Sequence, residues 1–127
     1  MNSEKVIFGF FITLAAALNF GFWTGEMDRV ELHNVWELAA AIVASLIATV
    51  LKFGDRTQIG AVHLSTSLVA DLQLIAAAMV WGYAAHVGGS GMTPEMTARV
   101  VSLSGGALFA NVVSVIILIA ETIMQRR

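Results

Sequence analysis

Residues 60–87, GAVHLSTSLVADLQLIAAAMVWGYAAHV, form the stretch that decides the fold class of this chain. The stretch exceeds the roughly 20 mostly apolar residues that an α-helix needs to cross a bilayer. It contains one acidic side chain, Asp71, and no Lys or Arg. The sequence therefore predicts a transmembrane helix here, with a carboxyl group far from either end.

Three further stretches are also long and apolar enough to cross a bilayer, at about residues 5–24, 35–53 and 94–124. Asn34 followed by Glu37 is typical of a helix start, and so is Thr93 followed by Pro94. Because the links are short, consecutive helices should run antiparallel. We expect an all-α integral membrane protein, with one membrane domain over residues 1–127 that folds as an up-down-up-down four-helix bundle.

The composition excludes most classes of soluble protein. Hydrophobic residues make up 57% of the chain and charged residues 13%, against about 25% charged residues in an ordinary soluble domain. The chain has no cysteine and a net charge of −2, and it contains no P-loop, G-x-S-x-G or dinucleotide motif. We therefore expect no enzyme, no catalytic residues, no metal site, no cofactor and no nucleic-acid partner.

The distribution of Lys and Arg predicts the orientation in the membrane. One side of the predicted bundle has five basic residues: Lys5, Lys52, Arg56, Arg126 and Arg127. The other side has only Arg29 and Arg99. Since basic segments stay in the cytoplasm, both termini should be cytoplasmic (N-in, C-in), in the inner (plasma) membrane of a bacterium.

Small residues recur at a spacing of four along two predicted helices, a pattern that favours close helix packing in lipid. The stripe at the first helix consists of Gly9, Thr13, Ala17, Gly21 and Gly25. The stripe on the second helix includes Ala41 and Ser45. The partner of these surfaces can be another helix of the same chain or a second copy of it, and we expect a homo-oligomer.

The third predicted helix has a line of polar residues at a spacing of four, His63, Ser67 and Asp71. Asp71 lies eleven residues after Gly60, which is about 16 Å along a helix and close to the middle of a hydrocarbon layer about 30 Å thick. A charged aspartate at that depth costs roughly 2.5–3.5 kcal/mol. Such a residue is either satisfied by neighbours inside the protein or has a function.

Both interpretations of Asp71 remain open from the sequence. In the first, the carboxyl group is protonated or hydrogen bonded to Asn111, Ser67 or Ser45 and fixes the helix register. In the second, it is an ion or proton site, with Asn111 of the fourth helix and the Ser67–His63 line as parts of a pathway. Gln73 lies on nearly the opposite face of the third helix, which indicates protein or water on that side too.

Two functional hypotheses follow. The first is a small oligomeric membrane protein that forms, or forms part of, a pathway for a monovalent cation or a proton centred on Asp71. Because four short helices leave no room for a pore inside one subunit, several copies would place a ring of Asp71 around an axis. The second is an accessory or scaffolding subunit that conducts nothing and binds a larger membrane complex in the lipid bilayer.

Overall fold

The computed structural model describes residues 3–89 and 91–125, and these residues contain helices and no strand. The elements are α1 (Ser3–Trp23), the short helix η1 (Val30–Leu32), α2 (Val35–Lys52), α3 (Gln58–Gly82), the π-helical turn η2 (Tyr83–Val87) and α4 (Pro94–Gln125). Arg126 and Arg127, which contributed to the predicted orientation, lie outside the described residues.

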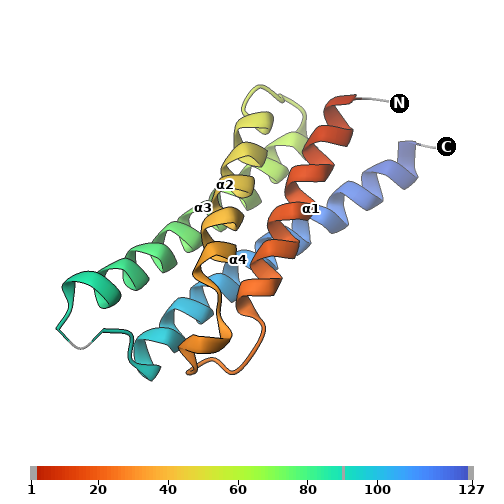
Figure 1. The fold of residues 1–127 in the computed structure, drawn as a ribbon. Helices are drawn as coiled ribbons and strands as arrows, with labels where there is room; N and C mark the ends of the chain where they lie inside the picture. Colours follow the sequence, from red (N-terminus) through yellow and green to blue (C-terminus); the bar gives the residue numbers. More distant parts are fainter. Residues whose placement is uncertain (1–2, 90, 126–127) are drawn as a thin grey trace.

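The four predicted helices are confirmed. Each is long and apolar enough to cross a membrane, when α3 is counted together with its π-helical turn. Helix α1 packs against α2 and α4, and α3 packs against the same two helices. Figure 1 shows both ends of the chain and the α2–α3 turn at one end of the molecule, here called the terminal end. The connections α1–α2 and α3–α4 lie at the opposite end, here called the distal end.

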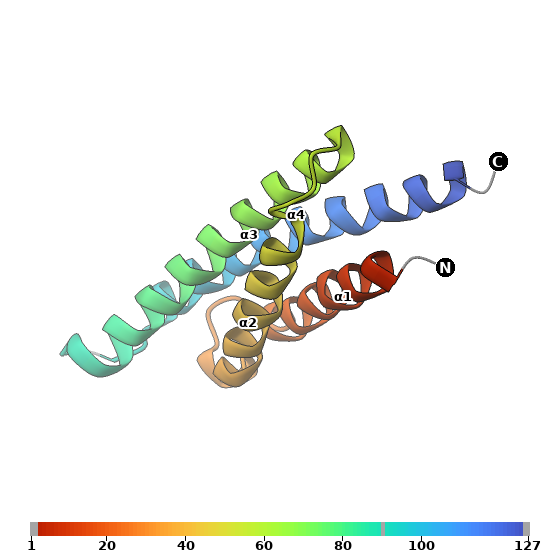
Figure 2. The ribbon, with the colours of Figure 1, turned by 90° about the horizontal axis from the view of Figure 1, so that it is seen from above.

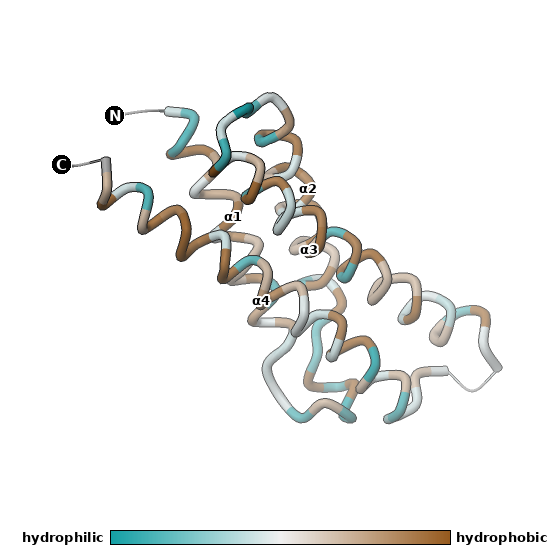
Figure 3. Tube along the Cα trace, turned by 180° about the vertical axis from the view of Figure 1, so that it is seen from behind, coloured by the Kyte–Doolittle hydropathy of each residue, from teal (hydrophilic) through white to brown (hydrophobic). Residues whose placement is uncertain are grey.

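Helices α3 and α4 lie alongside each other over most of their length (Figure 2) and form the largest helix contact. Figure 3 shows that the hydrophilic residues gather mostly in the connections and near the helix ends, while apolar residues dominate the helices. Exposed positions along the helices are accordingly large and apolar, including Leu72, Met79 and Phe109. Such a surface is suited to lipid rather than to water.

Local hydrogen bonds explain where three of the helices begin. Asn34 is the N-cap of α2, as the sequence predicts, and its side chain accepts from Trp36 N at 2.9 Å. The Thr57 hydroxyl accepts from Gly60 N at 2.9 Å at the start of α3, and the Thr93 hydroxyl accepts from Met96 N at 3.1 Å at the start of α4. These bonds satisfy amide groups that the first helical turn leaves without a backbone partner.

The small-residue stripe of the first helix lies only partly inside the bundle. Gly9 lies close to Leu118 of α4, and Gly21 lies against the side chain of Glu37 on α2. Thr13 and Ala17 are exposed.

Gly25 departs from the expected stripe, because it follows the end of α1 and has a φ of 108°, which L residues rarely adopt. On α2, Ala41 and Ser45 are fully buried.

Two apolar clusters make up the rest of the core. The smaller one, near the terminal end, is formed by Phe8, Ile12 and Ala48. The larger one extends to the distal end and contains Phe22, Leu38, Ala41, Ala70, Leu74, Ala77, Val100, Val101, Ala107 and Ala110. Polar side chains occupy much of the interior between these clusters, and they form the candidate site.

Candidate functional site

Asp71 is 6% exposed and faces α2 of its own chain. Ser45 Oγ lies 2.6 Å from Asp71 Oδ1, and Thr49 Oγ1 lies 2.5 Å from Asp71 Oδ2. Ser45 and Thr49 are one turn apart on α2, so both hydroxyls reach the two carboxyl oxygens from the same face. No ion pair in the described part of the chain includes Asp71.

The Thr49 hydroxyl has two neighbouring oxygens. Besides Asp71 Oδ2, it lies 2.9 Å from the backbone carbonyl of Ser45. A hydroxyl group has one hydrogen, so it either shares that hydrogen between these two oxygens or donates to one of them. If it donates to the carbonyl of Ser45, the close contact with Asp71 Oδ2 requires a hydrogen on the carboxyl group. With a neutral Asp71, each of the three close oxygen pairs therefore has its own hydrogen: Ser45–Asp71, Thr49–Asp71 and Thr49–Ser45 carbonyl.

His63 is fully buried between α1 and α4, toward the terminal end from Asp71. Its Nδ1 lies 2.6 Å from Ser114 Oγ on α4, and the ring of Phe8 packs against the imidazole in an edge-on contact with centroids 4.9 Å apart. The other ring nitrogen, Nε2, has no hydrogen-bond partner in the described residues and lies 4.0 Å from Glu121 Oε1. His63 thus connects a buried serine with a carboxylate near the terminal end.

Ser67 and Asn111 lie one helical turn from the His63–Ser114 contact, on α3 and α4 respectively. The two helices run in opposite directions, because His63 meets Ser114 whereas Gln73, ten residues on, meets Gly106. Ser67 and Asn111 are therefore at the same level of the bundle. Both are fully buried, and Ser67 Oγ, Asn111 Oδ1 and Asn111 Nδ2 have no hydrogen-bond partner among the described residues.

These side chains form one group, which we call the polar column. Its members are Ser45, Thr49, His63, Ser67, Asp71, Asn111 and Ser114, and all of them are buried. A buried polar group without a partner costs about 1–3 kcal/mol, and native proteins satisfy most such groups with protein or with water. The level of Ser67 and Asn111 offers three polar atoms, which suffices to hold a buried water.

The polar column ends near the middle of the bundle. One turn beyond Asp71, the Ser104 hydroxyl bonds the side-chain oxygen of Asn19 in a separate contact between α4 and α1. Farther toward the distal end most buried side chains are apolar, among them Phe22, Leu38 and Val100, and the polar residues His33 and Thr97 are buried there as well.

Charged side chains surround a cavity at the terminal end, and we call this region the charged mouth. Lys5 Nζ contacts Glu121 Oε2 at 3.0 Å, and Lys52 Nζ lies 3.5 Å from Asp55 Oδ2 and 4.3 Å from the centre of the Phe8 ring. A cavity of about 630 Å³ opens here, with Phe8 in its wall.

Hydrogen bonds from the Thr57 hydroxyl and backbone N–H, assisted by Lys52, hold the pKa of the Asp55 carboxyl below its usual value. Asp55 therefore stays ionised at the mouth over the neutral pH range.

Four of the five residues predicted for the pathway are buried in the bundle: His63, Ser67, Asp71 and Asn111. Gln73 is not part of the polar column; its side chain lies against Gly106 on the α4 side of α3. The predicted ring of Asp71 around an axis between subunits does not match this geometry, because the carboxyl group faces Ser45 and Thr49 of the same chain.

Sequence reasoning missed Thr49 and Ser114 as members of the polar column. A signal for both was present. Thr49 continues the spacing of four from Ser45 on α2, and Ser114 follows Asn111 by three residues on α4. Each therefore shares a helix face with a residue that the sequence did single out.

Comparison with known proteins gives the family. No curated protein and no solved structure matches the chain. The matching family model covers residues 32–122, which include α2, α3, most of α4 and every member of the polar column. The chain therefore belongs to the family described as "Family of unknown function (DUF6394)".

Proposed function

We propose that this chain forms part of a proton pathway in the membrane, in which Asp71 is the proton-binding group and the polar column is the route to it. The observation that carries the proposal is the hydrogen count at Thr49. A separate hydrogen bond in each of the three close oxygen pairs around Asp71 takes three hydrogens, and the two hydroxyls supply only two. A proton on the carboxyl group supplies the third.

Burial supports a proton in preference to a metal cation. A charged carboxylate in the apolar interior is costly without a partner, and a bound proton removes that charge. Both hydroxyls next to Asp71 already lie at hydrogen-bond distance from its two oxygens. A cation such as Na⁺ would need several further oxygen ligands, whereas a proton needs only one of the carboxyl oxygens. The proton is therefore the simpler occupant of the two.

The route between Asp71 and the terminal end consists of groups that exchange protons. Imidazole, hydroxyl and amide side chains of His63, Ser67 and Asn111 lie in sequence, and a water at the Ser67–Asn111 level would close the gap. Glu121, near His63 Nε2, provides the contact with the surface. The pathway has one polar half, so a second conformation of the chain must complete it.

The proposal places the bundle in an up-down-up-down arrangement in a bacterial inner membrane, with the terminal end in the cytoplasm. Lys5, Lys52 and Arg56 at the terminal end support this orientation, since basic segments stay in the cytoplasm. Exposed small residues on α1, Thr13 and Ala17, support association with a second copy or with a larger membrane complex.

Infrared spectroscopy of the purified protein tests the proton on Asp71. We expect a protonated-carboxyl C=O band in the wild type at neutral pH and its absence in Asp71→Asn. Removal of both donors in Ser45→Ala/Thr49→Val should shift this band, because the carboxyl group loses its hydrogen-bond partners. A wild type without the band, or a band that survives Asp71→Asn, overturns the assignment.

Proteoliposomes with an internal pH dye and an imposed K⁺ diffusion potential test the pathway. We expect potential-driven proton uptake in the wild type, loss of that uptake in Asp71→Asn, and unchanged uptake in Gln73→Leu. Gln73 is the matched control, because it is a polar residue two positions away on α3 that lies outside the polar column. Folded wild-type protein whose vesicles take up no more protons than protein-free vesicles overturns conduction by this chain and supports the non-conducting accessory subunit.

A further inference from the structure

A groove follows the outer surface between α3 and α4, on the side of α3 away from Asp71. It consists of three hollows of about 290, 500 and 350 Å³. The first two share Glu95 and Arg99 in their walls, and the second and third share Leu103. Shared wall residues make the hollows one continuous groove from the distal end to the middle of the bundle.

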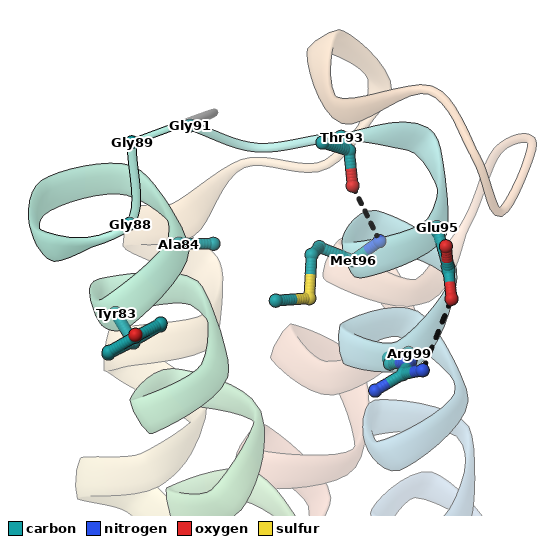
Figure 4. A pocket seen from close by; sticks show the side chains of 9 residues that line it. All are labelled: Tyr83, Ala84, Gly88, Gly89, Gly91, Thr93, Glu95, Met96 and Arg99. Atoms are coloured by element: carbon teal, nitrogen blue, oxygen red, sulfur yellow. Dashed lines mark hydrogen bonds and ion pairs between the residues drawn. The ribbon is translucent and has the colours of Figure 1, made fainter.

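The groove changes from polar to apolar along its length. Its distal end is lined by Tyr83, Thr93, Glu95 and Arg99 among others. Figure 4 shows this end: Ala84 from the end of α3 and Met96 from the start of α4 point into the space between the two helices. The part nearer the middle of the bundle is lined mainly by apolar side chains, namely Val69, Leu72, Ala76, Val80, Ala98 and Leu103.

The length of the apolar part matches one lipid chain. From Val80 to Val69 the groove follows eleven residues of α3, which is about 16 Å at 1.5 Å per residue. Half of a hydrocarbon layer about 30 Å thick is about 15 Å. Gln73 also lines the hollow nearest the middle of the bundle, and its side-chain oxygen lies against Gly106 of α4, so the inner end of the groove has one polar side chain.

The polar end carries one group of each charge. Arg99 NH2 contacts Glu95 Oε1 at 3.1 Å, and the two side chains are 66% and 77% exposed. An ion pair this exposed contributes little to stability, so a ligand can replace it at low cost. Arg99 suits a phosphate, whereas Glu95 would repel a headgroup that carries only negative charge. Glu95 suits an ammonium group that donates hydrogen bonds.

We propose that this groove binds a phospholipid of the distal leaflet whose headgroup contains both a phosphate and a primary ammonium, with one acyl chain along the apolar part. Arg99 binds the phosphate and Glu95 binds the ammonium. This site is independent of the polar column, because it lies on the other side of α3 and shares no residue with it.

Native mass spectrometry of the full chain in detergent tests the proposal, with phosphatidylethanolamine, phosphatidylcholine and phosphatidylglycerol of identical acyl chains as probes. We expect phosphatidylethanolamine to bind about tenfold more tightly than either of the others, a difference of 1.4 kcal/mol. Glu95→Gln should remove that preference, and Arg99→Gln should weaken the binding of all three lipids. Ala98→Leu should weaken all three without any change of charge, because it fills the apolar part.

The matched control is Glu31→Gln. Glu31 forms an equally simple exposed ion pair with Arg29 at 2.8 Å, near the same end of the molecule but outside the groove. We expect lipid binding to this variant to equal that of the wild type. Equal affinity of the wild type for the three lipids, equal effects of Glu31→Gln and Glu95→Gln, or unchanged binding to Ala98→Leu would each overturn the proposal.

Discussion

The terminal and distal halves of this bundle are built from the same four helices but bury different side chains. On α3, the buried positions toward the terminal end include His63, Ser67 and Asp71, whereas those toward the distal end are Leu74 and Ala77. The distal half buries polar side chains too, but His33, Thr97 and Ser104 each have a hydrogen-bond partner there. Most buried side-chain polar atoms without a partner among the described residues lie in the terminal half, on His63, Ser67 and Asn111.

Helices α4 and α1 also bury different side chains in the two halves. Helix α4 buries Val100 and Val101 in the distal half, and Asn111 and Ser114 in the terminal half. Helix α1 contributes a buried aromatic ring to each half, Phe22 and Phe8. The polar character of the terminal half thus comes from α2, α3 and α4, the part of the chain that the family model covers.

The largest expected change in stability concerns the distal half. Phe22→Ala should lower the free energy of unfolding by about 3–5 kcal/mol, because it removes a fully buried ring and leaves a cavity. Thermal unfolding in detergent, followed by tryptophan fluorescence, measures the loss.

The control for this substitution is Phe20→Ala. Phe20 is two residues away on α1 and 53% exposed, so its removal should change stability little. Equal losses of stability in the two variants would show that packing around Phe22 does not stabilise the distal half.

A smaller change in stability, of opposite sign, is expected in the terminal half, which contains the polar column. Asn111→Leu replaces a buried polar amide by an apolar side chain of similar size, and neither Asn111 Oδ1 nor Nδ2 has a partner in the described residues. Stability should stay unchanged or rise by about 1 kcal/mol, because the cost of an unsatisfied amide is removed. The same unfolding assay measures it. A loss as large as that of Phe22→Ala would mean that Asn111 is essential to packing.

The smallest effect concerns the charged mouth of the terminal half. The folded-state pKa of Asp55 is lowered, so its ionised form stabilises the fold above the unfolded-state pKa of about 3.9, and this contribution is lost as pH falls through the folded-state pKa. Asp55 is partly exposed, so the contribution should be below about 1 kcal/mol. The difference in Tm between wild type and Asp55→Asn should be largest near neutral pH and disappear below pH of about 3. A difference that grows in acid would contradict the assignment.

Sequence alone predicted the four helices, because each has a long apolar stretch, and two of them begin at a recognisable cap, Asn34 or Thr93. It also predicted that His63, Ser67 and Asp71 share a helix face, which follows from their spacing. It could not predict which neighbour Asp71 meets, since that depends on how α3 is rotated against α2. The same rotation places Gln73 outside the polar column and turns Asp71 toward Ser45 and Thr49 of its own chain.

The depth of Asp71 links the proposed proton site to the membrane potential. A membrane potential of 100 mV is worth about 2.3 kcal/mol for one elementary charge that crosses the whole membrane. In the proposed pathway, a proton that reaches Asp71 from the terminal end crosses about half of the hydrocarbon layer, so the same potential changes its binding free energy by about 1 kcal/mol. Proton binding at this depth should therefore depend on membrane voltage.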